Sequence, residues 1–501
     1  FTGLTATGFR NCDEGYYYHP ALVMRLAGQP LPILYYYHGT IVWVHLGCRL
    51  LGFSPAGALR WAAVNGLAGI LLLFLFCRKM LPTRTSLLAA LCLAMAYYPV
   101  YYSRINLSNI YGMFFTLLAM LPLAHLAAML DKATGDGQPL RNGRHLAVGA
   151  AAFGAIAGLT FHVRVESFLF LCGMAGALAL AALIKAETAA TRRRWAMQLL
   201  TGGAISGMMA IIAYALFTVA YLPWFRRDQT IEWYLKNVPF MTGAATAWGP
   251  YLFTHLWHLS GIPFWGIAIL GVAVESRRWR TLALPRLWLL LCLTGAVIGF
   301  TLLGIPFPRA HLMLVVLMCI YWAIGVRLAT AWCPGWRCAA AVILAGATFA
   351  GELRLIKPMF AKRAGYDRAA AVMRANPGDI IHNSNWPIFR SYLPGQKQFL
   401  LDELVAGEHA ADDLAQVVDY GIRRGWRYLA LDYYTDMDHF GDFLAPLAAC
   451  APAAILVNDY GEDFHNFMDA RGRPPAHHAF SDKIALYDLH ELSLVLARIE
   501  Q

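Results

Sequence analysis

Two adjacent carboxylates near the start of the chain, Asp13 and Glu14, are the residues best suited to proton transfer. They lie in the segment Asn11-Cys-Asp-Glu-Gly-Tyr-Tyr-Tyr-His-Pro20, inside a chain that is otherwise strongly apolar. A carboxylate that is poised as a general base takes the proton from an attacking hydroxyl group. The alternative is a solvated loop before a helix, with Asp13 as the helix N-cap.

Arginines recur at the ends of predicted membrane spans, where they would complement such a base. Arg104 lies in Tyr101-Tyr-Ser-Arg-Ile-Asn-Leu-Ser-Asn109, and Arg309 follows two prolines in Gly304-Ile-Pro-Phe-Pro-Arg309. The planar guanidinium group matches phosphate oxygens and keeps its charge at neutral pH. Each arginine is either a phosphate ligand or an interfacial side chain that extends its charge into the headgroup region.

Three further polar residues flank predicted spans. Arg164 and Glu166 lie in a very short turn between two spans. They either pair with each other or line an internal cavity, since charge at membrane depth usually faces an interior. His38 either donates to a phosphate or is a structural histidine. The residues predicted to line a substrate are Tyr17, Tyr37, Tyr102, Asn109 and Glu166.

The long loop predicted over 223–255 carries polar groups whose roles stay open. Arg226, Arg227 and Asp228 either gate a site or form a solvated face. His255 and His258 have a helical i, i+3 spacing that suits a metal ion, but no carboxylate lies near them in the sequence. A divalent-metal requirement is therefore unknown.

The composition predicts a polytopic membrane protein. The chain has 501 residues, of which 58% are hydrophobic and 14% charged, and its mean hydropathy is +0.48. Soluble proteins carry about 25% charged residues. The length allows about 10–11 spans and one soluble domain. Because the chain begins at Phe1 without a methionine, we expect that a first membrane helix is missing.

The net charge of +11 does not indicate a nucleic-acid partner. The basic residues occupy short loops between apolar runs, where they determine membrane topology. The ten cysteines form no CxxC pair and mostly lie inside apolar runs. They are interpreted as small apolar residues and not as a disulfide or zinc framework.

The apolar runs alternate with loops of contrasting charge. An interfacial helix is expected over 31–52, with a true span as the alternative. Spans are predicted at 57–77, 85–102, 108–129, 146–162, 167–186, 196–222, 256–275, 285–304, 310–331 and 337–355. One alternate set of loops is rich in Lys and Arg, and the positive-inside rule makes it cytoplasmic. It contains Arg78, Lys79 and Arg84, then Lys132, Arg141 and Arg144, then Lys185 and Arg192–Arg194, then Arg277, Arg278, Arg280 and Arg286, and finally Arg337. The acidic pair, the candidate arginines and the C-terminus then all lie outside.

Beyond about residue 356 the pattern changes to that of a small soluble α/β domain with a largely parallel sheet. Strands are expected at 379–382, 398–401, 428–431, 454–457 and 483–487. Helices are expected near 366–375, 409–424 and 437–448. No GxGxxG motif or P-loop supports nucleotide binding. The predicted domains are therefore 1–56, a first extracytoplasmic loop with juxtamembrane helices; 57–356, the transmembrane domain; and 357–501, an extracytoplasmic domain.

One acidic site and several arginines at outer span ends suit sugar transfer from a polyprenyl phosphate. One carboxylate takes the proton of the acceptor as its oxygen attacks the anomeric carbon. Attack from the face opposite the leaving group inverts the anomeric configuration. The leaving group is already a phosphate, so it needs cationic donors and not a general acid.

The order of these motifs resembles that of the GT-C membrane glycosyltransferases, and looks like the branch with protein O-mannosyltransferases and lipid A aminoarabinose transferases. The segments that carry the resemblance are Asp13-Glu14, Tyr35-Tyr-Tyr-His-Gly39, Leu50–Arg60, Tyr102-Ser-Arg104 and Phe307-Pro-Arg309. The resemblance covers most of residues 10–331. It implies a polyprenyl-phosphate-sugar donor, a catalytic acid at Asp13, juxtamembrane helices in the first outer loop, and one membrane helix before the acidic pair.

Two positions depart from the family pattern. Many relatives carry a second acidic residue about five positions after the arginine of the Ser-Arg motif, where this chain has Asn109. An amide hydrogen-bonds a sugar hydroxyl but cannot act as a base. Ala310 also follows Arg309 where relatives often have tyrosine. Either Asp13 and Glu14 do all the acid–base work, or the acceptor differs, or activity is weak.

The sequence therefore predicts an inverting, mannosyltransferase-like glycosyltransferase of the cell envelope. It would span the inner (plasma) membrane and move a hexose or pentose from a polyprenyl phosphate to a lipid, glycan or protein outside the cytoplasm. Asp13 would be the base with Glu14 supporting it, and the phosphate would bind Arg104, Arg309, Arg164 and His38. The alternatives are a non-catalytic assembly subunit on the same scaffold, and a lipid or solute transporter.

Overall fold

The computed structural model describes residues 12–26, 38–135, 143–186, 188–221, 260–302, 312–361, 364–382, 386–401, 413–432, 443–457 and 483–499. The chain divides into two compact units. The first contains residues 1–26, 44–61 and 359–501, and the second contains residues 27–43 and 62–358. The boundaries predicted from the sequence at 56 and 356 stay a prediction.

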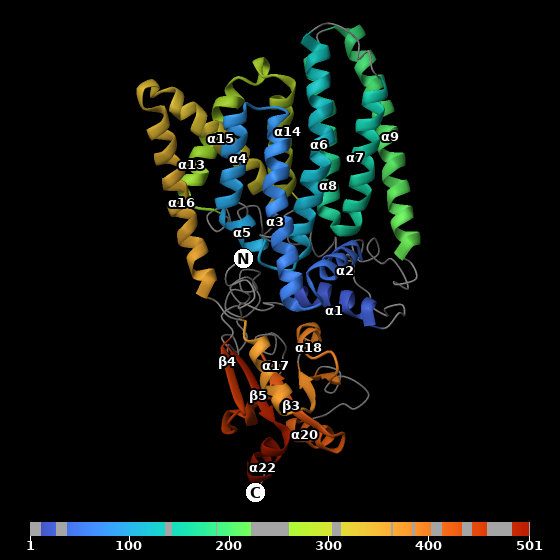
Figure 1. The fold of residues 1–501 in the computed structure, drawn as a ribbon, viewed down its shortest axis with the longest axis vertical. Helices are drawn as coiled ribbons and strands as arrows, with labels where there is room; N and C mark the ends of the chain where they lie inside the picture. Colours follow the sequence, from blue (N-terminus) through green and yellow to red (C-terminus); the bar gives the residue numbers. More distant parts are fainter. Residues whose placement is uncertain are drawn as a thin grey trace. The chain divides into compact units, whose positions relative to one another are not determined.

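The second unit is a bundle of long apolar helices (Figure 1). Its helices are α3 (Pro55–Arg78), α4 (Thr83–Met95), α5 (Tyr97–Tyr102), α6 (Ser108–Gly135), α7 (Gly143–Val163), α8 (Val165–Lys185), α9 (Ala189–Tyr221), α13 (Ile262–Arg277), α14 (Leu284–Leu302), α15 (Leu312–Ala331) and α16 (Arg337–Ala361), of which α3 begins in the first unit. Among the described residues, seven helices are long and apolar enough to cross a membrane, and two apolar helices are shorter. The chain is therefore a multi-pass membrane protein.

Where the structure describes them, the predicted spans are largely helical, but the span expected at 85–102 is interrupted. The helix α4 ends at Met95, and Ala96 is extended with φ −61° and ψ 131°. The short helix α5 then begins at Tyr97. This break lies just before the segment that carries Arg104.

Small residues let neighbouring helices approach closely. Gly154 and Gly158 of α7 face the backbone of α9. A Cβ atom at Gly154 would collide with the Ser206 carbonyl oxygen, and one at Gly158 would collide with the Ala210 carbonyl oxygen. Inside a lipid bilayer this close backbone packing replaces the hydrophobic effect as the force that associates helices.

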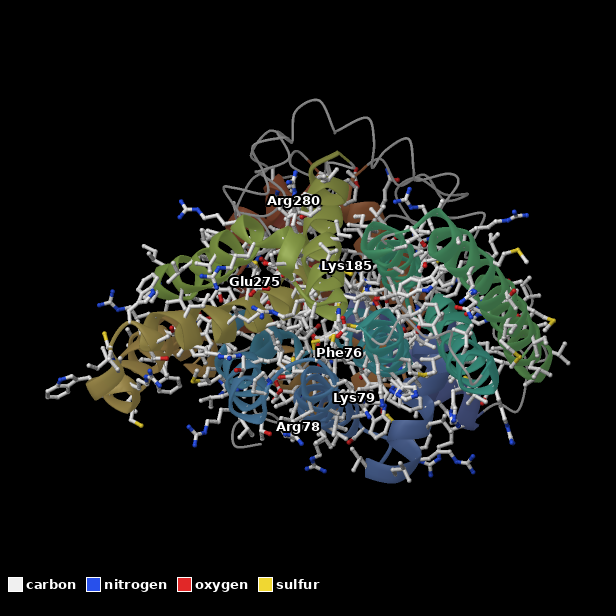
Figure 2. All side chains as sticks on the ribbon, turned by 90° about the horizontal axis from the view of Figure 1, so that it is seen from above. Phe76, Arg78, Lys79, Lys185, Glu275 and Arg280 are labelled. Atoms are coloured by element: carbon white, nitrogen blue, oxygen red, sulfur yellow. The ribbon has the colours of Figure 1, made fainter. Side chains whose placement is uncertain are left out.

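Basic residues gather at one end of the bundle. Figure 2 looks onto this end, with Arg78, Lys79, Lys185 and Arg280 around it. The ammonium group of Lys185 donates to the Arg280 carbonyl oxygen at 2.9 Å. Nearby, buried Glu275 pairs with Arg286 of α14. The charge pattern predicts this grouping, and the side of the membrane that it faces stays a prediction.

The first unit contains a five-stranded sheet in the order β2-β1-β3-β5-β4. The strands are β1 (Asp379–His382), β2 (Gln398–Leu400), β3 (Trp426–Leu431), β4 (Ala454–Val457) and β5 (Lys483–Asp488). The prediction of a largely parallel sheet is wrong, because β1 is parallel to β2 and β3 while β5 is antiparallel to β3 and β4. The sheet is therefore mixed.

The helices of this domain are α17 (Tyr366–Ala375), α18 (Trp386–Tyr392), α20 (Leu414–Arg423) and α22 (Leu489–Ile499). The helix α20 forms because Asp413 caps the Gln416 amide at 2.8 Å and its apolar residues share one face. That face packs on Trp426 and Leu429 of β3. Within the predicted helix 437–448, residues 437–442 lie outside the described residues, and Ala445–Ala449 form only a short 3₁₀ turn.

Two short helices belong to the first outer loop of the prediction, α1 (Cys12–Leu26) and α2 (His38–Leu51). Of the interfacial helix expected over 31–52, residues 31–37 lie outside the described residues and 38–51 form α2. The choice between an interfacial helix and a span stays a prediction. The helix α1 begins at Cys12, so Asp13 lies inside its first turn. The alternative of Asp13 as an N-cap is therefore wrong.

Candidate functional site

A cluster of buried polar residues lies at the end of the bundle opposite the basic residues, at the lower ends of α5, α7 and α8 in Figure 1. We call it the buried polar cluster. Its members come from α2, the α5–α6 linker, the start of α6 and the α7–α8 junction. They are His38, Thr40, Arg104, Asn106, Ser108, Asn109, Arg164 and Glu166, and all of them except Glu166 are buried.

Arg164 connects two of these segments. It is the one residue between α7 and α8, and its backbone is extended, with φ −166° and ψ 114°. Its guanidinium group donates to the Ser108 hydroxyl oxygen at 2.8 Å and pairs with Glu166 at 3.3 Å. The short turn predicted from the sequence is confirmed, and Arg164 and Glu166 do pair.

Gly112 makes room for the Arg164 side chain as it crosses α6. A Cβ atom at this position would lie 2.6 Å from the Ser167 hydroxyl oxygen and 2.9 Å from the Cδ atom of Arg164. Contacts below 3.0 Å require a neighbour to shift. The glycine on α6 therefore determines the path of the guanidinium group toward Ser108.

The start of α2 packs on the same junction. The Thr40 hydroxyl group donates to the Val163 carbonyl oxygen at 2.8 Å. A Cβ atom at Gly39 would lie only 2.7 Å from the backbone carbon of His162. Buried His38 is thus held beside the turn that carries Arg164.

The α5–α6 linker is fixed by its own polar contacts. Tyr111 donates from its hydroxyl group to the Asn106 side-chain oxygen at 2.7 Å. The ring of Tyr102 meets that of Tyr98 edge-on, with centroids 4.9 Å apart. Arg104 lies between these two anchors and is buried, as is Asn109 in the first turn of α6. The structure thus brings His38, Tyr102, Arg104, Asn109, Arg164 and Glu166 to one end of the bundle.

The acidic pair lies on α1 in the other compact unit. Glu14 and Tyr17 are buried, so this segment is not a solvated loop; the Asp13 side chain is outside the described residues. The helix α1 packs against α18 of the C-terminal domain. On α2, the Nδ1 atom of His45 lies 2.8 Å from the Ala21 carbonyl oxygen. Elements from both ends of the sequence therefore hold the acidic helix.

His19, on the same helix, is buried and faces Arg390 of α18. Burial, and secondarily the charge of Arg390, lowers its pKa to about 4. The imidazole is therefore neutral at pH 7. A neutral ring is compatible with a cationic neighbour, whereas an imidazolium ion would be repelled by it.

Several predicted site residues lie outside the described residues. These are Tyr37, Arg226, Arg227, Asp228, His255, His258 and Arg309. In the part of the chain that the structure describes, no group of three or more His, Cys, Asp or Glu side chains is placed to hold a metal ion.

One buried carboxylate near the predicted outer side of the bundle is not among the residues predicted from the sequence. Glu352 lies inside α16 and accepts three hydrogen bonds from two other segments. The sequence does contain a signal for Glu352, because an ionisable residue within an apolar span indicates a defined partner or function. Its partners are mostly backbone N–H groups, which no residue pattern reveals.

No protein-family model and no curated protein matches the sequence, whereas solved structures match the fold. ArnT from Cupriavidus metallidurans in the apo state matches with 13% identity and a TM-score of 0.61, over 99% of this chain and 96% of that one. The same protein bound to undecaprenyl phosphate matches with 13% identity and a TM-score of 0.57, over 97% and 95% of the two chains.

The oligosaccharyltransferase of Archaeoglobus fulgidus, tethered to an acceptor peptide, is a third similar structure. It matches with 12% identity and a TM-score of 0.53 over 86% of this chain. The match spans 66% of the length of the oligosaccharyltransferase. At these identities the likeness establishes a shared fold.

Proposed function

We propose that this chain, which has the fold of the GT-C membrane glycosyltransferases, transfers a sugar from a polyprenyl phosphate to an acceptor hydroxyl with inversion at the anomeric carbon. The acceptor would be a lipid, glycan or protein on the extracytoplasmic face of the inner membrane. The similar structure of ArnT holds undecaprenyl phosphate, which supports a donor of this class.

The observation that carries the proposal is the pair of buried arginines, Arg104 and Arg164, at one end of a membrane bundle. Burying a guanidinium group is costly unless hydrogen bonds and an anion compensate it. The guanidinium groups of these two arginines have the donor geometry and the charge that suit phosphate oxygens.

We assign Arg104, Arg164 and His38 to the donor phosphate, together with Arg309. The planar guanidinium fork binds two phosphate oxygens at once. As the bond between the anomeric carbon and the phosphate oxygen breaks, negative charge grows on the phosphate. Fixed cations that are already in place stabilise this charge more in the transition state than in the bound donor.

We assign the proton transfer to Asp13, with Glu14 in support. The acceptor oxygen forms a bond to the anomeric carbon from the face opposite the phosphate, and its proton passes to the carboxylate. The polyprenyl phosphate leaves with the electron pair of the broken bond. Neighbouring residues on a helix point about 100° apart, so one of the two carboxylates serves as the base.

The aromatic and amide residues would hold the sugar. Tyr17, Tyr37 and Tyr102 offer ring faces and hydroxyl groups, and Glu166 offers a carboxylate. Asn109 would hydrogen-bond a sugar hydroxyl through its amide. It cannot take a proton, so the acid–base chemistry falls to α1.

One observation favours a second candidate function, that of a non-catalytic assembly subunit on the same scaffold. Asn109 stands where a second acidic residue is expected from the resemblance, and loss of that residue would fit a loss of catalysis.

A transfer assay separates the two functions. Membranes that contain the full chain are incubated with radiolabelled polyprenyl-phosphate sugars, in wild type, Asp13→Asn and Glu14→Gln. Label that reaches an acceptor in wild type and is lost in Asp13→Asn supports the enzyme. Equal label in wild type and in membranes that lack the chain supports the assembly subunit.

A further inference from the structure

Glu352 is a fully buried carboxylate in α16. It lies on the inward-facing stripe of this helix with Thr348 and Ile356, which are also buried. Thr348 accepts a hydrogen bond from the Trp322 indole nitrogen of α15 at 3.0 Å. The face of α16 that carries Glu352 is therefore fixed against the bundle.

Both oxygens of this carboxylate accept hydrogen bonds from other segments. Its Oε2 atom accepts from the Tyr97 amide at 2.6 Å. Its Oε1 atom accepts from the Gly261 amide at 2.6 Å and from the Ser260 hydroxyl at 2.9 Å. All three partners can donate to the carboxylate oxygens, so the hydrogen bonds offset the cost of burying the carboxylate.

The donor groups lie at the N-termini of two helices, α5 and α13, whose N-cap residues provide no side-chain acceptor. The first amides of a helix lack intrahelical partners and are usually satisfied by a neighbouring side-chain oxygen. Ala96 precedes α5 and Gly261 precedes α13, and neither has a side-chain oxygen. Glu352 provides the missing acceptor to both from a third helix, 255 positions beyond Tyr97.

The position of α5 matters because the helix leads directly to Arg104. The helical conformation is interrupted at Ala96, and the six residues of α5 connect this interruption to the α5–α6 linker. The Arg104 amide donates back to the Tyr101 carbonyl oxygen at 3.1 Å, and Tyr102 packs on Tyr98. A displacement at Tyr97 would therefore pass along one short helix to the arginine.

We infer that Glu352 is a positioning residue, which holds the start of α5 so that Arg104 meets the phosphate of the polyprenyl-linked donor. Only the contact between Arg104 and the donor phosphate rests on the proposed function. A carboxylate is required, because the amide of a glutamine would point a donor at a backbone N–H group. The negative charge that strengthens all three bonds would also be lost.

The test compares Glu352→Gln with Glu275→Gln in the full-length protein in lipid nanodiscs. Glu275 is a matched control, because it is also a buried carboxylate but pairs with Arg286 at the other end of the bundle. Two quantities are measured: the binding of undecaprenyl phosphate, and the hydrogen–deuterium exchange of the peptide that covers 96–107. Neither quantity requires turnover. Glu352→Asp serves as a conservative variant with the same charge.

We expect Glu352→Gln to speed the exchange of residues 97–102. We also expect it to weaken undecaprenyl phosphate binding roughly 10- to 100-fold, which is the loss of one charge-assisted hydrogen bond from a misaligned Arg104. Glu352→Asp should fall between this variant and wild type, and Glu275→Gln should match wild type. Because Glu352 acts through Arg104, the double variant Glu352→Gln/Arg104→Gln should bind no more weakly than Arg104→Gln alone.

Unchanged exchange at residues 97–102 in folded Glu352→Gln would overturn the inference. Additive losses in the double variant would do the same, since they would mean that Glu352 does not act through the arginine. If wild type binds no undecaprenyl phosphate, the proposed function is wrong. The exchange at Tyr97 would then still decide whether Glu352 holds α5.

Discussion

The guanidinium group of Arg164 donates to the hydroxyl oxygen of Ser108 at 2.8 Å, across 56 positions of sequence. This bond joins the α7–α8 junction to the start of α6, four residues after Arg104. It places two buried arginines in one polar environment at the end of the bundle.

Replacing Arg164 with lysine should weaken donor use more than it weakens the fold. Lysine keeps the charge but loses the fork that holds Ser108 and Glu166 together. We expect the KM for the polyprenyl-phosphate sugar to rise roughly tenfold, a loss of about 1.4 kcal/mol, with the acceptor KM unchanged. Steady-state kinetics with each substrate varied in turn measures both constants. A rise in the acceptor KM alone would show that Arg164 serves the acceptor.

Replacing Gly112 with alanine should disturb the site through sterics alone. The added methyl group would lie 2.6 Å from the Ser167 hydroxyl oxygen and 2.9 Å from the Cδ atom of Arg164, so these side chains must shift. We expect lower transfer activity at a nearly unchanged Tm. Gly173→Ala on α8 is the control, because nothing lies within 4 Å of its added Cβ atom. Equal activity in the two variants would contradict the role given to Gly112.

The stability of the unit that contains α1 should depend on pH through His19. Its pKa is lowered from 6.5 to about 4 in the folded protein. Between these values the unfolded chain binds more protons, so the free energy of unfolding rises with pH. The stabilisation is complete above about pH 6.5 and is lost as the pH falls through about 4, up to about 3 kcal/mol in all.

Thermal unfolding of wild type and His19→Gln between pH 4.5 and 7.5 tests this expectation. Glutamine does not titrate, so its Tm should vary less with pH than that of wild type. Parallel curves for the two proteins would show that His19 is not the group responsible.

Removing Arg286 from its ion pair with Glu275 should destabilise the protein more than removing Glu275. The Glu275 side chain is 3% exposed, whereas that of Arg286 is 34% exposed. Arg286→Ala leaves a buried carboxylate unpaired and should cost about 3–5 kcal/mol. Glu275→Gln leaves an arginine that still reaches water, so its cost should be smaller. A comparison of the two Tm values in detergent decides this, and a larger loss in Glu275→Gln would contradict it.

The sequence predicts the membrane helices well because each is encoded by a local apolar run. It also predicts the tight turn at Arg164, since two long runs leave no room for a loop. The break at Ala96 is hidden because Tyr97–Tyr102 continue the apolar run. The antiparallel pairing of β5 cannot be read from strand-length runs, since pairing direction depends on contacts between distant segments.

The candidate site also has features that the sequence predicts and features that it does not. The types of Arg104, Arg164 and Asn109 and their places at span ends point to one polar cluster. The hydrogen bond to Ser108, the space left by Gly112 and the role of Glu352 depend on helices far apart in sequence. They become visible only when those helices are packed.

A transfer assay with Asp13→Asn tests directly whether the chain transfers a sugar with Asp13 as its base. Membranes with wild type or Asp13→Asn protein, matched for amount and for Tm, receive a radiolabelled polyprenyl-phosphate sugar. We expect labelled acceptor in wild type and none above background in the variant, because the amide cannot take the acceptor proton. Labelled acceptor at equal rates in both would contradict the assignment of Asp13 as the base.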